Sequence, residues 1–206
     1  HGYTPPRRFL PYLSWTEIAA LPDKANTVIV LPAGATEQHG PHLPLSTDTV
    51  IAVALAEALG RVRADVLVTA PIAVSASGEH AGFPGTLSIG SEVFERLLVE
   101  LVRSADWATG VVLVNGHGGN APALAAAIET LRYEQRNVLP WWPTPPAGER
   151  GDAHAGWLET SVMLHLAPHL VRLDRVERGA TQPLAELMGG LREHGVLGVS
   201  PNGVLG

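Results

Sequence analysis

Short apolar runs alternate with longer amphipathic stretches along this chain. The short runs are rich in Val, Ile and Leu and are apolar at consecutive positions, which is typical of strands buried on both faces. They predict strands at residues 26–34 and 65–74, in the strand-to-loop segment 110–120, and at residues 137–142. The longer stretches, with apolar residues at helical spacing, predict helices at 47–63, 91–104, 121–135, 157–167 and 183–195. We expect Ser91 to be the N-cap of the second helix and Gly195 to end the last one.

The order of these elements predicts the fold class. Strands that alternate with helices and are apolar on both faces indicate a mostly parallel sheet with helices on both sides. We therefore expect an α/β fold of three α/β/α layers in a single domain spanning residues 1–206. The chain ends at "SPNGVLG" without a closing element, so we expect the complete protein to continue past Gly206.

Composition and charge exclude several classes of function. The formal net charge is −6 and the 14 basic residues are scattered, which argues against nucleic acid or an anionic membrane as a partner. The sequence contains no Cys, so it has no disulfides or thiolate metal sites, and a bound metal would need imidazole and carboxylate ligands. It also lacks a membrane-length apolar run and the apolar core of a signal peptide, and we expect a cytoplasmic protein.

Polar stretches follow all of the predicted strands. They read "EQHGPHLPLSTD", "SASGEHAGFPGT", "NGHGGN" and "GDAHAGWLETS" in chain order. The loops that follow the strands of a parallel sheet emerge at one edge, where open α/β proteins bind their ligands. We expect that edge to gather the imidazoles and carboxylates of these loops, which are Glu37, His39, His42, Asp48, Glu79, His80, His117, His154 and Glu159.

This set of side chains favours a metal site. Imidazoles and carboxylates without thiols suit Zn²⁺, Mn²⁺ or Fe²⁺. Glu37 and His39 are two residues apart in an extended loop, so both side chains project to the same side. Asp48, at the start of the next helix, can point back and bridge two ions. The loop at residues 143–152 is long enough to form a lid or an edge of the site.

Structural roles are the alternative for these residues when each is taken alone. Glu37, Asp48 or His117 in isolation is compatible with a turn or capping role, and His42 favours a structural role. The pair Glu79–His80 suits a turn cap as well as a substrate pocket. Surface or packing roles are favoured for a further group, namely His165, His169, His194, Trp141 and Trp142. The convergence of four loops on one edge favours a site.

The chain also resembles a known family at these positions. The segments "GATEQHGPHLPLSTD", "GEHAGFPGT", "NGHGGN" and "HAGWLETS" are similar, in this order, to those of the creatininase (creatinine amidohydrolase) family over residues 27–175. Within that family the chain looks most like the creatininase-type peptidases of mycofactocin biosynthesis. The segments "WWP" and "HAGWLETS" and the tail that begins "ERGATQPLAELM" carry this second resemblance.

The resemblance implies a site for two divalent metal ions. Glu37, Asp48 and His117 would hold one ion. His39, the bridging Asp48 and a second carboxylate would hold the other. Creatininases carry an aromatic residue and then a Glu directly after the loop His, whereas this chain has Gly118 and Gly119. Since Gly119 cannot be a ligand, we expect Glu159 to supply the missing carboxylate.

The resemblance also implies roles around the substrate. His154 would carry a proton to the leaving nitrogen, since an imidazole titrates near neutral pH. Glu159 would act with it at the reaction centre, and Ser77 and His80 would orient the substrate. Gly118 and Gly119 remove bulk from the pocket, which disfavours creatinine and leaves room for a larger amide such as a peptide tail.

We therefore expect a metal-dependent amidohydrolase with two divalent ions per subunit, Zn²⁺ or Fe²⁺, with Mn²⁺ compatible. The resemblance implies that it releases a C-terminal Val-Tyr dipeptide from a modified precursor peptide and forms a homo-oligomer. One alternative is a small-molecule hydrolase of the same family, such as a formamide deformylase or a creatininase. The other is a non-catalytic module that binds a metal or a peptide. An open coordination position would distinguish an enzyme from such a module, because structural metal sites are closed.

Overall fold

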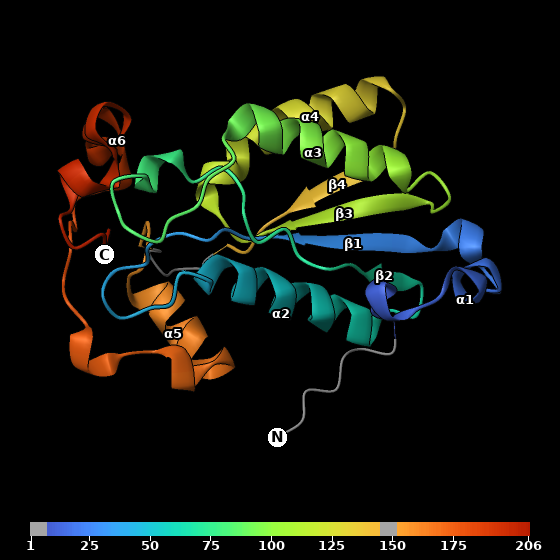
Figure 1. The fold of residues 1–206 in the computed structure, drawn as a ribbon, viewed down its shortest axis with the longest axis horizontal. Coiled ribbons are helices and arrows are strands. Elements are labelled where there is room, and N and C mark those ends of the chain that lie inside the picture. The colour runs from blue at the N-terminus through green and yellow to red at the C-terminus, as the bar shows by residue number, and fades with distance from the viewer. Residues whose placement is uncertain (1–7, 145–151) are drawn as a thin grey trace.

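A computed structural model describes residues 8–144 and 152–206, and residues 145–151 of the predicted loop 143–152 lie outside the described part. Within the described residues the sheet has four parallel strands in the order β2-β1-β3-β4 (Figure 1). The strands are β1 (Val28–Ala33), β2 (Val66–Val68), β3 (Gly110–Asn115) and β4 (Val138–Trp141). The sequence predicted all four of them and their parallel arrangement.

Helices cover both faces of this sheet (Figure 1). α3 and α4 pack together on one face, and α2 and α5 lie on the other, while α6 lies beyond the carboxyl ends of the strands. The helices are α1 (Trp15–Ala19), α2 (Thr47–Val62), α3 (Ser91–Ser104), α4 (Ala121–Tyr133), α5 (Trp157–Leu166) and α6 (Leu184–Val199). The three-layer α/β/α prediction is confirmed. None of the helices in residues 8–144 and 152–206 combines the length and the apolar character needed to cross a bilayer.

Apolar side chains fill the space between each layer of helices and the sheet. Phe94 and Leu98 of α3 and Leu131 of α4 are buried on one side, in the same cluster as Leu113 of β3. On the other side Ala56 of α2 packs among valines of the strands, namely Val30, Val66, Val68 and Val114. Because both faces are covered, the central strands are apolar at consecutive positions.

Strand β2 is shorter than predicted. It pairs with β1 only from Val66 to Val68, whereas the apolar run predicted a strand over residues 65–74. Pro71 has no N–H to donate to a ladder, which explains why regular pairing does not continue through this run. The segment returns to the sheet only as an isolated bridge between Ile72 and Ala33.

The helices differ from the sequence-based expectations at two boundaries and in one additional helix. Ser91 is the first residue of α3, and the cap is Gly90, which has φ of 77° and no side-chain hydrogen bond to the helix. Gly195, with φ of 65°, was predicted to end the last helix, but it only interrupts α6, which continues to Val199. Helix α1 was not predicted from the sequence, although Ser14 and Glu17 form a complete capping box at its start.

Two glycines allow the first turn of α2 to approach the carboxyl ends of the central strands. A side chain at Gly34, directly after β1, would collide with the backbone of Thr49. A side chain at Gly116, directly after β3, would collide with the backbone carbonyl of Asp48. The absence of side chains at both positions therefore places Asp48 between the loops that follow β1 and β3.

Candidate metal centre

Imidazoles and carboxylates from several loops meet at the carboxyl edge of the sheet. Glu37 and His39 follow β1, Asp48 lies in the first turn of α2, and His117 follows β3. His154 precedes α5, and Glu159 lies in the first turn of that helix. Together with Glu79 and His80 from the loop after β2, these side chains form overlapping groups with spacing suited to metal ions. The groups are Glu37–His39–Asp48, Glu37–Glu79–His117, His39–His154–Glu159 and Glu37–His80–His154. The structure thus brings together the predicted ligands.

Asp48 lies between two of the imidazoles. Its Oδ1 is 3.0 Å from Nε2 of His39, and its Oδ2 is 3.2 Å from Nδ1 of His117. The same nitrogen of His117 lies 3.1 Å from Oε1 of Glu37. Asp48 therefore faces both halves of the cluster, which is the position that a bridging carboxylate needs.

Backbone carbonyls fix the tautomers of His39 and His117. They thereby decide which ring nitrogen carries the lone pair that faces the carboxylates. Nδ1 of His39 lies 3.1 Å from the carbonyl oxygen of Glu37, and Nε2 of His117 lies 3.0 Å from that of Ala76. Because a carbonyl oxygen only accepts, the nitrogens beside the carbonyls must donate. In the neutral rings the other nitrogens, Nε2 of His39 and Nδ1 of His117, carry lone pairs directed at the carboxylates.

This arrangement requires a cation. Lone pairs of imidazole nitrogens and carboxylate oxygens repel each other at about 3 Å unless a proton or a metal ion lies between them. Both oxygens of Glu37 and Oδ2 of Asp48 are buried and lack a hydrogen-bond partner among the described residues. The donor set of imidazoles and carboxylates without thiols is the one that Zn²⁺, Mn²⁺ and Fe²⁺ accept. The residues present therefore fit a metal centre.

The pKa values show how protons compensate the buried carboxylates. Burial disfavours the charge on His39, but the Asp48 carboxylate outweighs this effect and raises the pKa of His39 to about 10. The pKa of His117 is raised as well, because Asp48 and Glu37 outweigh its burial. Burial alone would raise the pKa of Asp48, yet the charge of His39 holds it below its ordinary value. Burial raises the pKa of Glu37.

Glu159 is directed towards His39. Its Oε2 accepts a hydrogen bond from the backbone N–H of Ala155 at 2.6 Å and lies 3.9 Å from Nε2 of His39. Burial, partly offset by His39, raises the pKa of Glu159 to about 7. The structure therefore places Glu159 beside His39, and its role as the missing carboxylate ligand stays a prediction.

His154 belongs to the same group as His39 and Glu159. Its Nε2 is 2.8 Å from the carbonyl oxygen of Gln38 and therefore donates, which leaves a lone pair on Nδ1. That Nδ1 is 3.8 Å from Oε1 of Glu37. Burial, assisted by the charge of His39, lowers the pKa of His154 well below its ordinary value. A two-way backbone bridge to Leu205 fixes the position of the residue.

The residues predicted to lie beside the substrate differ in their surroundings. The Ser77 hydroxyl is buried and has no hydrogen-bond partner among the described residues. His80 is buried beside Glu37, and burial lowers its pKa to about 4. A side chain at Gly118 would meet open space, whereas one at Gly119 would collide with Glu79 and His117. The expected extra room therefore exists only at Gly118, because the Glu79 carboxylate fills the space beside Gly119.

Other residues singled out in the sequence lie outside the cluster. His42 is buried, and its Nε2 lies 2.9 Å from the Thr160 hydroxyl, which agrees with a structural role. The exposed residues of this group are His165, His169, His194, Trp141 and Trp142. Gln38 had no expected role, although it lies between the predicted ligands Glu37 and His39 and contacts two of the buried imidazoles.

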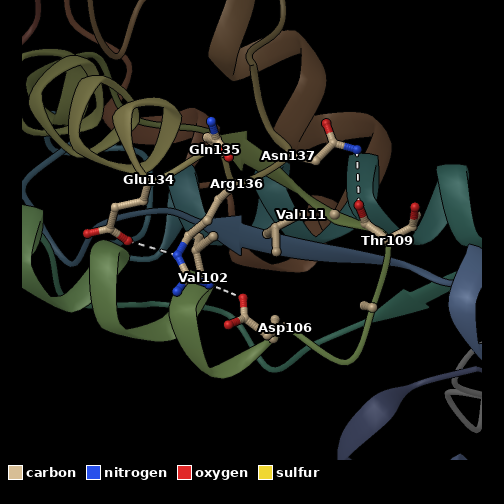
Figure 2. Close-up of a pocket in the computed structure, with 11 residues that line it drawn as sticks. Val102, Asp106, Thr109, Val111, Glu134, Gln135, Arg136 and Asn137 are labelled. Carbon is tan, nitrogen blue, oxygen red and sulfur yellow. Dashed lines mark hydrogen bonds and ion pairs between the residues drawn. The ribbon is translucent and has the colours of Figure 1, made fainter.

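A separate hollow of about 330 Å³ lies at the opposite edge of the sheet (Figure 2). Residues before β3 and β4 line it, including Thr109 and Asn137, whereas the cluster lies after the strands. Arg136 is paired there with both Glu134 and Asp106. Since its carboxylates are paired with a guanidinium and none of the described residues that line it carries an imidazole, the hollow does not resemble the centre at the carboxyl edge.

Comparisons with known proteins agree with this geometry. The chain is 53% identical over 185 residues to the mycofactocin precursor peptide peptidase of Mycolicibacterium smegmatis, covering 87% of this chain and 74% of that protein. A solved structure of a manganese form of creatininase matches with a TM-score of 0.75 and 30% identity, over 85% of this chain and 80% of that chain. A Zn–Zn form of a mutant creatininase matches with a TM-score of 0.74 and 30% identity, over 85% and 78% of the two chains.

The sequence model of the family described as "Creatininase: Creatinine amidohydrolase" matches residues 11–206. This range contains all the buried imidazoles and carboxylates of the cluster and every strand and helix of the fold. The chain belongs to the creatininase (creatinine amidohydrolase) family.

Proposed function

We propose that this chain is a metal-dependent amidohydrolase that binds two divalent ions and releases a C-terminal Val-Tyr dipeptide from the modified mycofactocin precursor peptide. The observation that carries the hydrolase assignment is the pair of imidazole lone pairs, on His39 and His117, that face unpartnered buried carboxylates. The substrate assignment is supported by the 53% identity to the peptidase of M. smegmatis, compared with 30% to the creatininase structures.

The ligands divide into two sets that share Asp48. Glu37, Asp48 and His117 would hold one ion, and His39, Asp48 and Glu159 would hold the other. Two divalent cations so held supply an activated water and polarise the scissile carbonyl. Zinc and iron are the proposed metals and manganese is compatible, in agreement with the Mn and Zn–Zn forms of the structural relatives.

His154 is the residue suited to move the proton. Its resting state is neutral with the lone pair on Nδ1, so it first accepts a proton and then donates it to the leaving nitrogen. Glu159 lies in the same group and shares the reaction centre. Ser77, whose buried hydroxyl has no partner among the described residues, orients the substrate directly, and His80 acts on it through the neighbouring Glu37 carboxylate. The open space at Gly118 admits a larger group than creatinine.

Two alternatives have weaker support. A small-molecule hydrolase of the same family would not need the open space beside Gly118. A non-catalytic binding module would not need His154, a neutral base beside the ligands. We also propose a cytoplasmic homo-oligomer, for which Trp141 and Trp142, 45% and 47% exposed on and beside the edge strand β4, offer a contact surface.

The substrate assignment predicts one defined cleavage. Incubation of the metal-loaded protein with the modified precursor peptide should release Val-Tyr, because the site is proposed to act on that terminal amide. Mass spectrometry of the fragments measures this outcome. Hydrolysis of creatinine or of a small formamide, with the peptide left intact, would favour the small-molecule alternative. No hydrolysis of any of these amides, with the metals bound, would favour the binding module.

Asp48→Ala should remove both metal ions, because the two ligand sets share this carboxylate. Elemental analysis should find about two divalent ions per chain in the wild type and close to none in the variant. Asp65→Ala is the matched control, since Asp65 is paired with Arg63 just before β2, away from the cluster. Full metal content and activity in Asp48→Ala would contradict the two-ion site.

Glu159→Gln should weaken the ion held by His39 by at least about 10-fold and leave the ion held by His117 nearly unchanged. The reason is that Glu159 is closest to His39 and belongs to one ligand set only. Stepwise metal titration by calorimetry separates the two events. Glu129→Gln on α4 serves as the control. Equal weakening of both ions, or of neither, would remove Glu159 from the ligand set.

His154→Asn should retain both metals and lower kcat by a factor on the order of 10²–10⁴, the range for a lost proton-transfer residue. The loss should shrink for substrates with better leaving groups, which need less protonation. Kinetics with a leaving-group series tests this, with His165→Asn, at an exposed position of α5, as the control. Loss of a metal would make His154 a ligand. Equal losses across the series would make it a substrate-positioning residue.

A further inference from the structure

Gln38 contacts two buried imidazoles at once. Its Nε2 lies 2.8 Å from Nδ1 of His80 and 3.1 Å from Nε2 of His154. The side chain is itself buried, with 5% of the residue exposed. An amide in this position can act as a donor or an acceptor towards each ring, so its orientation decides where the protons of the rings lie.

Two backbone contacts fix that orientation. Oε1 of Gln38 accepts a hydrogen bond from the N–H of Gly40 at 2.9 Å, and Nε2 donates to the carbonyl oxygen of Gly203 at 3.0 Å. A backbone N–H only donates and a carbonyl oxygen only accepts, so exchanging the amide oxygen and nitrogen would break both bonds. Nε2 of Gln38 therefore faces the imidazoles with its second N–H.

This N–H determines the tautomer of His80. It points at Nδ1 of His80, which must accept it and so carries a lone pair. The proton of the neutral ring is then on Nε2, the nitrogen that lies 3.4 Å from Oε1 of Glu37. His80 thus turns an N–H towards the cluster, whereas three other rings, when neutral, turn a lone pair towards it, namely His39, His117 and His154.

His154 does not compete with His80 for the N–H of the Gln38 amide. Nε2 of His154 donates to the backbone carbonyl oxygen of Gln38 at 2.8 Å, so its own N–H occupies that side of the ring. One residue therefore fixes the Nε2–H tautomer in two neighbouring imidazoles, which turn different ring nitrogens towards the cluster. The side-chain amide of Gln38 gives His80 an inward N–H, and the backbone carbonyl gives His154 an inward lone pair.

We propose that Gln38 is a positioning residue that holds His80 as an inward hydrogen-bond donor. Nε2 of His80 then has no lone pair for a metal ion, although His80 lies in a group with ligand-like spacing together with Glu37 and His154. Its N–H instead faces Oε1 of Glu37 at 3.4 Å, and in the metal-bound protein it would orient this carboxylate in the way that hydrogen bonds hold metal-binding carboxylates in place. The effect on turnover rests on the proposed hydrolase function, whereas the tautomer does not.

The direct test is the tautomer of His80 in the metal-free protein. Two-dimensional NMR of protein with ¹⁵N-labelled histidine reports which ring nitrogen carries the proton, and a His80→Asn sample assigns the signals. The wild type should show His80 protonated on Nε2 and not on Nδ1. Protonation on Nδ1 alone, or on both nitrogens at neutral pH, would overturn the proposal.

Two variants extend the test. Gln38→Glu replaces the donor by an acceptor and should move the proton of His80 to Nδ1, while Gln38→Met removes the contact and should give a mixture of tautomers. Ser200→Ala is the matched control, because it removes a hydrogen bond to Val204 within the turn that carries Gly203 but leaves the Gln38 amide in place. It should leave the tautomer unchanged. If Gln38→Met and Gln38→Glu, shown by circular dichroism to be folded, also left it unchanged, Gln38 would have only a structural role.

Turnover separates this proposal from the proposed function. Gln38→Met should keep its metal content and cleave the precursor peptide about 10–100-fold more slowly, the usual range for losing a group that orients a metal ligand. Unchanged turnover with a mixed tautomer would overturn the part of the proposal that links the donor to Glu37. If the wild type showed the expected tautomer but cleaved no peptide, the proposed function would fail and the tautomer assignment would stand.

Discussion

The burial of Glu37 and Asp48 is the constraint on which the rest of the site depends. Their side chains are 0% and 2% exposed, and an ionised carboxylate in such surroundings needs a compensating cation. In the metal-free protein, protons on His39 and His117 provide this charge, which is why the pKa values of both rings are raised. Divalent ions would displace those protons and use the lone pairs that remain. The same constraint thus accounts for the perturbed pKa values and for the fit to metals.

The fold meets this constraint with backbone groups. The carbonyls of Glu37 and Ala76 orient two of the imidazoles, and they belong to the loops that follow β1 and β2. The close approach at Gly34 and Gly116 then brings the first turn of α2, and with it Asp48, between these loops. The rigid sheet edge therefore sets the positions of the ligands, as a preorganised site requires.

The sequence predicted the parts of this arrangement that depend on topology and residue type. Alternation of strands and helices placed the loops at one edge, and the residue types in those loops indicated metal ligands. It did not predict contacts between side chains of distant segments. The filling of the space at Gly119 by Glu79 and the contact of Gln38 with His154, 116 residues away, depend on how loops pack in three dimensions. Helix α1 is a different case, because the capping box of Ser14 and Glu17 that begins it is a local pattern and could have been recognised in the sequence.

The most direct test of the account is the anomalous scattering of Mn²⁺-loaded crystals, because it locates each ion relative to the ligands without relying on activity. The account predicts two anomalous peaks about 3.5–4 Å apart on either side of Asp48. One peak should lie beside Glu37 and His117, and the other beside His39 and Glu159. A single peak, or two peaks that do not share Asp48, would contradict the central claim that this buried carboxylate bridges two metal ions.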